Sequence, residues 1–220
     1  DTLMYTLAGL SPEDRGWGIA GDTFHVLDEA RRRGLEDWFQ LGDRDLITHL
    51  ARTAALARGE TLTEVTRTLC HGLGVDPVIL PMSDGPRPTT VVTPNGVELD
   101  FQEWLVRARA APVVKALRYG GDGRPSPQAV DALAIADLIV ICPSNPYVSI
   151  DPILTLAGVR DALEQTRVVA VSPILGGRAV KGPLATMIPQ VSGQAASAEA
   201  VAEHYGSLLD AYFVHPGDGF

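Results

Sequence analysis

Two stretches in the second half of the chain begin with an unbroken run of apolar residues and then change to small and polar ones. The first covers residues 137–151 and the second covers residues 167–183. A continuous apolar run is typical of a strand that is buried on both faces of a parallel sheet. In open α/β sheets, ligands bind beyond the carboxyl ends of the strands. The two loops that follow these runs therefore indicate a site for a nucleotide or a phosphate group.

The first half of the chain has helical periodicity over residues 22–72. Asp22 is placed to cap a helix that runs to residue 34, and Asp43 is placed to cap a second helix. Thr61 and Glu64 have the spacing of a capping box, which opens a third helix.

Strand patterns begin after this helical segment. A strand is predicted at 78–82, and residues 94–96, Pro-Asn-Gly, predict a hairpin between strands 89–93 and 97–101. From residue 126 to residue 214, strands and helices alternate, as in a parallel sheet. The expected fold is α/β, with a Rossmann-like, doubly wound, mainly parallel sheet and a helical insertion. We expect one domain over residues 1–220, with the insertion at 22–72, a strand and hairpin region at 76–119 and βα repeats at 126–214.

Composition limits the classes of function. The formal net charge of −9 in 220 residues argues against a broad nucleic-acid surface. No apolar stretch is long enough for a membrane span. The only cysteines, Cys70 and Cys142, are far apart, which fits a reducing cytoplasm. The five histidines show no metal-ligand spacing, so we interpret each as structural. The chain starts without Met inside an apparent helix, so we expect a segment of a longer protein.

Several polar motifs have two interpretations. In Gly-Asp-Arg-Asp at 42–45, the aspartates are helix caps and ion-pair partners, or Arg44 contacts a ligand through its planar guanidinium group. The segment 176–183 lacks the spacing of a P-loop, but it offers Arg178, Lys181 and backbone donors to an anion. Ser144 and Ser172 lie in no nucleophile elbow.

Seven short segments, spread from one end of the chain to the other, form a specific set in register. They are 1–9, 17–24, 41–45 with 48–49, 80–84, 101–104, 142–146 with 149–152, and 171–174 with 181–183. In this order they resemble the 2-phospho-L-lactate transferase family, which builds the deazaflavin coenzyme F420. That family also has an N-terminal strand, a Gly-rich loop and a further C-terminal stretch, so the resemblance implies that this chain lacks the N-terminal βα unit and is truncated at both ends. Gly85 stands where the family usually has a second Asp.

The resemblance implies a transferase reaction. The terminal hydroxyl of 7,8-didemethyl-8-hydroxy-5-deazariboflavin attacks the phosphate next to the lactyl or enolpyruvyl group of a guanosine diphosphate ester, and GMP leaves. Such a displacement calls for a metal ion, expected to be Mg²⁺, and for a carboxylate that orients the hydroxyl. The donor, lactyl or enolpyruvyl, stays open, as does a non-catalytic nucleotide- or sugar-nucleotide-binding regulatory module. A cytoplasmic homodimer without a nucleic-acid or membrane partner is expected.

The resemblance also implies roles for individual residues. Asp1 matches the last acidic residue of the family's Pro-Asp-Leu-Asp-Thr motif, which makes it the expected catalytic and metal-binding residue. The alternative is that Asp1 only caps the helix that follows it. Asp1, Asp43 and Arg44 are expected at the deazaflavin. The residues expected at the nucleotide are Ser144, Asn145, Pro146, Ser172, Gly176, Gly177 and Lys181.

Overall fold

The computed structural model describes residues 1–218 of the chain. The chain divides into two compact units, an N-terminal unit, Asp1–Asp84, and a C-terminal unit that begins at Gly85. The single α/β domain expected from the sequence stays a prediction.

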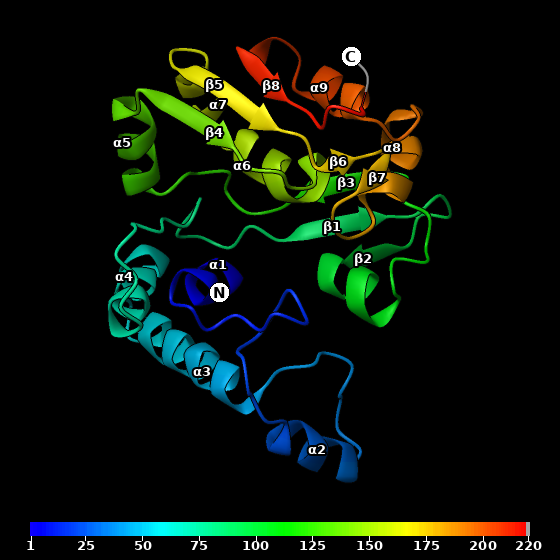
Figure 1. Cartoon of the computed structure of the whole chain (residues 1–220). Coiled ribbons are helices and arrows are strands. Elements are labelled where there is room, and N and C mark those ends of the chain that lie inside the picture. The colour runs from blue at the N-terminus through cyan, green and yellow to red at the C-terminus, as the bar shows by residue number, and fades with distance from the viewer. Residues whose placement is uncertain (219–220) are drawn as a thin grey trace. The chain divides into compact units, whose positions relative to one another are not determined.

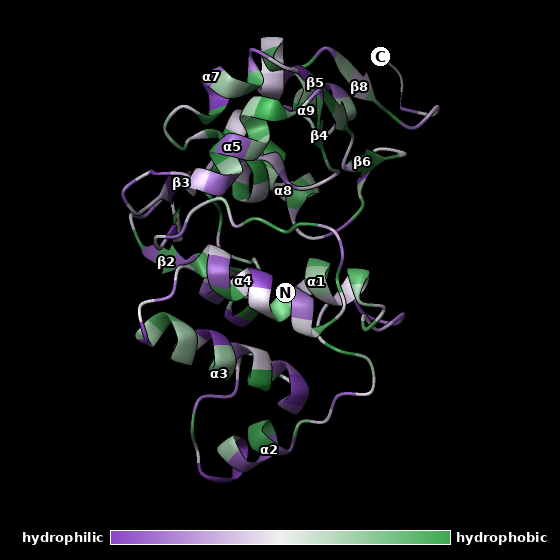
Figure 2. Cartoon of the chain, turned by 90° about the vertical axis from the view of Figure 1, so that its left-hand side faces the viewer, coloured by the Kyte–Doolittle hydropathy of each residue, from purple (hydrophilic) through white to green (hydrophobic). Residues whose placement is uncertain are grey.

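The N-terminal unit is helical (Figure 1). Its helices are α1 (Thr2–Leu7), α2 (His25–Arg32), α3 (Asp43–Ala57) and α4 (Leu62–Gly72). The helical character predicted for residues 22–72 is thereby confirmed. Figure 2 shows hydrophobic and hydrophilic residues together on α3 and on α4, as expected for helices that bury one face. One core cluster of buried residues consists of Met4, Tyr5, Ile19, Cys70 and Val75.

Helix α3 is capped by an aspartate from outside its own sequence neighbourhood. The Asp22 carboxylate accepts hydrogen bonds from the backbone nitrogens of Arg44 (2.8 Å) and Asp45 (3.1 Å), which lie in the first turn of α3. Gly42 occupies the N-cap position, and it is small enough to let Asp22 approach, because a Cβ there would lie 2.1 Å from Asp22 Oδ2.

Asp43, the first residue of α3, in turn caps α2. Its carboxylate accepts hydrogen bonds from the backbone nitrogens of His25 (2.9 Å) and Val26 (3.0 Å) and from the hydroxyl of Thr23 (2.6 Å). The prediction that Asp22 and Asp43 each cap the helix that follows them was wrong. The chain folds back between the two helices, so Asp22 caps α3 and Asp43 caps α2.

The start of α4 follows the prediction. Thr61 and Glu64 form the capping box, with a bond of 2.8 Å from the Thr61 backbone nitrogen to the Glu64 carboxylate. Asp84 also accepts a hydrogen bond from the Thr63 backbone nitrogen at 2.7 Å.

The strand predicted at 78–82 was wrong, because these residues form no strand. Pro77 and Pro81 flank the apolar residues and have no backbone N–H to donate to a sheet. The side chain of Val78 is correspondingly 83% exposed.

The C-terminal unit contains three small sheets. An antiparallel sheet has the order β2 (Glu98–Asp100), β1 (Thr89–Val92), β3 (Ala116–Tyr119). A parallel sheet has the order β4 (Leu138–Ile141), β5 (Arg167–Val171), β8 (Ala211–Phe213), and these strands lie side by side in Figure 1. A two-stranded hairpin joins β6 (Ile174–Leu175) and β7 (Arg178–Ala179). The hairpin predicted around residues 94–96 is confirmed as β1 and β2, with Gly96 at φ +83°.

Helices and helical turns precede and connect the parallel strands. The π-helical turn η1 (Glu103–Arg107) and the helix α5 (Pro127–Ile135) come before β4. Between β4 and β5 lie the π-helical turn η2 (Pro146–Ile150) and the helices α6 (Asp151–Leu154) and α7 (Val159–Leu163), and between β5 and β8 lie α8 (Leu184–Ser192), α9 (Ala198–Tyr205) and the 3₁₀ turn η3 (Gly206–Leu208). The central strand β5 buries Val168 and Ala170 completely. The expected α/β class with a parallel sheet is therefore confirmed. Within residues 1–218, no helix has the length and apolar character required to cross a bilayer.

Candidate functional site

Two carboxylates and an imidazole converge in the N-terminal unit. Asp1 immediately precedes α1, whereas Asp45 and His49 lie one turn apart on α3. Residues four apart share one face of a helix. His49 Nε2 lies 3.6 Å from a carboxylate oxygen of each aspartate, and one ligand atom from each of the three residues lies within 4.8 Å of the others. We call these three residues the acidic cluster.

Neighbouring side chains hold the acidic cluster in place. The Tyr5 hydroxyl donates a 2.7 Å hydrogen bond to Asp45 Oδ1, and Asp45 is buried with 8% exposure. The Arg52 guanidinium forms an ion pair with Asp1. Asp1 stands at the N-cap position of α1, but its side chain makes no capping hydrogen bond within the described residues. The capping interpretation of Asp1 therefore has no support in the geometry.

Burial affects the protonation of His49 and of Tyr5. It lowers the pKa of His49, the charge of Asp45 opposes this shift, and the positive charge of Arg52 adds to it. His49 is consequently neutral at pH 7 and offers a nitrogen lone pair. Burial likewise raises the pKa of Tyr5 to about 12, so its hydroxyl remains a donor to Asp45.

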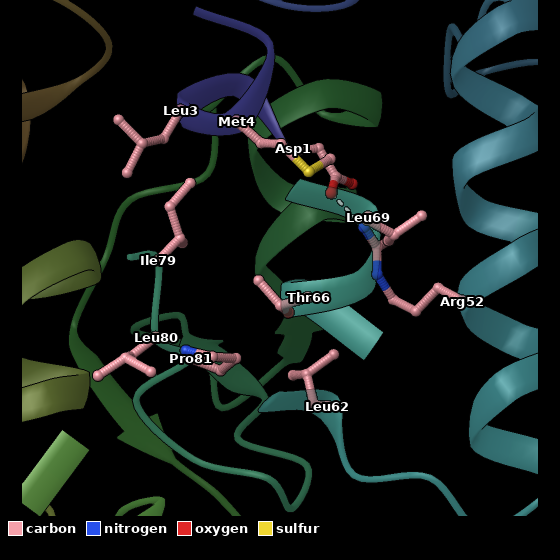
Figure 3. Close-up of a pocket in the computed structure, with 10 residues that line it drawn as sticks. All are labelled: Asp1, Leu3, Met4, Arg52, Leu62, Thr66, Leu69, Ile79, Leu80 and Pro81. Carbon is pink, nitrogen blue, oxygen red and sulfur yellow. Dashed lines mark hydrogen bonds and ion pairs between the residues drawn. The ribbon is translucent and has the colours of Figure 1, made fainter. Parts of the chain in front are cut away.

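A cavity of about 380 Å³ opens beside Asp1 and Arg52, whose ion pair is the dashed contact in Figure 3. The rest of its lining is mostly apolar and consists of Leu3, Met4, Leu62, Thr66, Leu69, Ile79, Leu80 and Pro81. Its volume is within the range of about 300–1,000 Å³ that is usual for small-molecule sites. The cavity therefore combines a mostly apolar wall with the charged groups of Asp1 and Arg52.

The residues expected at the deazaflavin have structural contacts of their own. Arg44 is exposed, and one guanidinium nitrogen donates to the carbonyl of Ala20 at 2.9 Å. The Thr23 hydroxyl and the backbone nitrogen of Val26 lower the pKa of Asp43, which fits its role as the cap of α2. Their contact with an acceptor stays a prediction.

The expected nucleotide loops lie in the C-terminal unit. Because β4 and β5 pair in parallel, the loops that follow them share one edge of the sheet, as predicted. The Asn145 side-chain oxygen accepts from the backbone nitrogens of Tyr147 (3.0 Å) and Val148 (3.4 Å), which caps η2. Pro146 is buried as the first residue of η2, and Ser144 is half-buried.

The other predicted nucleotide residues follow β5. The Ser172 hydroxyl is buried, donates to the Ile174 carbonyl (3.0 Å) and accepts from the Ile174 nitrogen (3.1 Å), so it shapes the bend into β6. Lys181 is exposed between β7 and α8. Gly176 and Gly177 form the turn between β6 and β7, with φ of +57° and +71°. Nucleotide binding by these residues stays a prediction.

Sequence reasoning missed three residues that make contacts at the candidate sites, namely Asp45, His49 and Asp218. Asp45 was interpreted only as a cap or an ion-pair partner and His49 only as structural, although their spacing of four residues on a predicted helix was an available signal. Asp218, which accepts from the backbone nitrogens of Gly176 (3.0 Å) and Gly177 (2.8 Å), had no signal, because it is distant in sequence from the turn.

The N-terminal unit thus carries an acidic cluster and an apolar cavity, and the C-terminal unit carries loops that follow the strands of a parallel sheet. The comparison with known families identifies the class. A model of the family 2-phospho-L-lactate transferase CofD matches residues 1–217, and the chain belongs to that family. The match confirms the resemblance drawn from the seven segments and the expected class, a transferase family of coenzyme F420 biosynthesis. It does not favour the non-catalytic regulatory module.

Curated relatives support the same family. The chain is 40% identical over 233 residues to a phosphoenolpyruvate transferase of Mycobacterium sp. (strain KMS), and the match covers 99% of this chain and 70% of the relative. It is 43% identical over 225 residues to a phosphoenolpyruvate transferase of Thermobifida fusca (strain YX), with the same coverage.

The solved structures show the fold alone. Protein BH3568 from Bacillus halodurans superposes with a TM-score of 0.60 at 19% identity, over 97% of this chain and 63% of that one. A second structure of the Bacillus halodurans protein, described as a member of the UPF0052 family, gives a TM-score of 0.57 at 18% identity. The chain thus spans less than two thirds of the length of these solved chains.

Proposed function

We propose that this protein transfers a phosphoenolpyruvate group from its guanosine diphosphate ester to the terminal hydroxyl of 7,8-didemethyl-8-hydroxy-5-deazariboflavin, with release of GMP. The family assignment supports the reaction type, and the names of the relatives favour the enolpyruvyl donor over the lactyl one. The observation that carries the proposal is that Asp1 belongs to the acidic cluster and also lines the mostly apolar cavity.

The chemistry is a displacement at phosphorus. The acceptor oxygen forms a bond to the phosphorus that bears the enolpyruvyl group, the bond from that phosphorus to the oxygen of GMP breaks, and the hydroxyl proton passes to a base. Asp1 is the candidate to orient the hydroxyl or take its proton. Arg52 fixes the Asp1 carboxylate through their ion pair, so the carboxylate is held in place before substrate binds.

The acidic cluster fits a small divalent cation. A metal–ligand distance of about 2.1 Å puts neighbouring ligand atoms about 3–4 Å apart, close to the spacing of the three residues. Asp1, Asp45 and the neutral His49 would hold the ion. Mg²⁺ is the ion expected, and the imidazole ligand also suits Mn²⁺. The ion, when bound, supplies positive charge that offsets the charge of the phosphate group.

We assign the ring of the acceptor to the apolar cavity of the N-terminal unit and the diphosphate of the donor to the loops that contain Asn145 and the Gly176–Gly177 turn. Burial of a flat ring against aliphatic side chains contributes about 25 cal/mol per Å² of apolar surface removed from water. The Rossmann-like sheet, the cytoplasmic location and the homodimer complete the proposal, and they rest on the family resemblance.

The decisive experiment is product analysis by mass spectrometry. The protein, deazaflavin and Mg²⁺ are incubated with the enolpyruvyl donor or the lactyl donor. We expect GMP and a deazaflavin phosphodiester, formed faster from the enolpyruvyl donor. Release of GMP from neither donor would refute the proposal. Asp1→Asn should lower kcat more than it changes deazaflavin affinity, and His49→Gln should raise the Mg²⁺ concentration needed for half-maximal rate.

The acceptor site is tested by fluorescence titration of deazaflavin. Leu62→Glu puts a charge on the cavity wall, while an acidic residue in the first turn of α4 is favourable for the helix. We expect this variant to bind deazaflavin at least about tenfold more weakly, since a carboxylate facing an apolar ring lacks a partner. Thr68→Glu, exposed on the same helix and outside the cavity, is the matched control. A loss with Arg44→Ala but not with Leu62→Glu would move the acceptor to Arg44.

A further inference from the structure

The turn between β6 and β7 holds a carboxylate in its backbone. Gly176 and Gly177 both have left-handed backbone conformations, and their successive N–H groups point to one acceptor. The Gly176 nitrogen lies 3.0 Å from one oxygen of Asp218, and the Gly177 nitrogen lies 2.8 Å from the other. Successive backbone N–H groups of this kind form a concavity that binds anions.

Asp218 reaches the turn from the end of β8. The Ser172 nitrogen donates to the Phe213 carbonyl at 2.8 Å, which keeps the chain beside the end of β5. A turn then brings Asp218 back, with its nitrogen bonded to the His215 carbonyl at 2.9 Å. The carboxylate is therefore presented on a short tether from a fixed strand.

The hairpin closes without Asp218. Ile174 pairs with Ala179, Leu175 pairs with Arg178, and the Val180 nitrogen donates to the Pro173 carbonyl at 2.9 Å. These bonds define the turn from within its own strands. The contact with Asp218 is additional to them.

We propose that the Gly176–Gly177 turn is a phosphate-binding site, and that Asp218 occupies it as an internal competitor that the diphosphate of the donor displaces. The inference rests on the proposed function, because this turn is where the diphosphate is assigned. A phosphate group offers the same pair of oxygens as the carboxylate and carries more charge. Arg178, the first residue of β7, and Lys181, which follows β7, are both exposed, and their positive charges favour an incoming anion.

The competitor reduces the apparent affinity of the site. A site that is open for a fraction of the time binds its ligand more weakly by that fraction. If Asp218 closes the turn for about nine tenths of the time, its removal tightens phosphate binding about tenfold. Removal also takes away a negative charge that repels the ligand.

Inorganic pyrophosphate is the probe, because it needs neither deazaflavin nor turnover. Its binding to the full chain is measured by calorimetry, and the Gly176 and Gly177 amide resonances are followed by NMR. Asp218→Ala should bind pyrophosphate about tenfold more tightly than the unchanged protein. Asp218→Asn, which keeps the shape and loses the charge, should lie between the two. Asp131→Asn is the control, because it removes an exposed negative charge on α5 in the same unit, and it should leave the affinity for pyrophosphate unchanged.

The outcomes separate this inference from the proposed function. Unchanged or weaker pyrophosphate binding in both Asp218 variants, with circular dichroism that shows a folded protein, would overturn the inference and leave Asp218 as a structural contact. Amide shifts that avoid both glycines at saturating pyrophosphate would overturn it even if Asp218→Ala did not fold. If pyrophosphate binds as expected while neither donor releases GMP, the inference stands and the proposed transferase reaction fails.

Discussion

Replacing Asp22 with Ala removes the carboxylate that caps the N-terminus of α3, the helix that carries Asp45 and His49. The lost bonds run from the Arg44 nitrogen at 2.8 Å and from the Asp45 nitrogen at 3.1 Å. Loss of a capping side chain costs about 0.5–2 kcal/mol, and because Asp22 serves two nitrogens we expect the upper half of this range. For a unit of this size, each kcal/mol lowers the Tm by roughly 4–8 °C. Thermal unfolding followed by circular dichroism at a helix wavelength measures the change.

Two companion variants make this expectation specific. Asp22→Asn keeps one oxygen acceptor and should cost less than Asp22→Ala. Gly42→Ala has an allowed backbone, with φ −76° and ψ 159°, but its Cβ would lie 2.1 Å from Asp22 Oδ2 and would displace the carboxylate. Its cost should therefore resemble that of Asp22→Ala, and the double variant should cost much less than the sum of the two. If the stability losses of the two single variants add up in the double variant, or if the Tm of Asp22→Ala is unchanged, Asp22 does not cap α3.

Three further predictions concern other contacts. The Thr23 hydroxyl is the main cause of the depressed pKa of Asp43, so the ionised carboxylate stabilises the fold above the ordinary pKa of 3.8, and this stabilisation is lost as the pH falls through the pKa of the folded protein. The urea midpoint of the unchanged protein should therefore exceed that of Asp43→Asn at neutral pH, and the difference should shrink as the pH is lowered. Tyr5→Phe removes the hydroxyl that donates to the buried Asp45 carboxylate and should lower the free energy of unfolding by about 1–3 kcal/mol in urea titrations, whereas an unchanged value would contradict the geometry. Asn145→Ala should lower the Tm through the lost cap of η2, and Asn145→Ser should restore the Tm; if Asn145→Ser leaves the donor KM raised, the amide contacts the donor, and if the KM also recovers, the residue acts only as a cap.

Local features of this protein could be read from the sequence. The capping box of Thr61 and Glu64 and the hairpin around residues 94–96 depend on residues within a few positions of each other, and both formed as predicted. The parallel pairing of β4 and β5 was also predictable, because unbroken apolar runs separated by helices have few other ways to bury both faces. The strand predicted at 78–82 failed because Pro77 and Pro81, on either side of the apolar residues, have no backbone N–H to donate to a sheet.

Contacts between residues distant in sequence were decided by the tertiary structure. Asp22 and Asp43 have the residue type of a cap, which the sequence shows, but the path of the chain between α2 and α3 determines which helix each one caps. The convergence of Asp1 with Asp45, and that of Asp218 with the Gly176–Gly177 turn, likewise depends on how helices and strands pack. The sequence by itself determined the family, the α/β class and many of the local elements, because these follow from short-range patterns and motif order. The position of one carboxylate relative to another depends on the whole path of the chain between them, and only the folded structure defines that path.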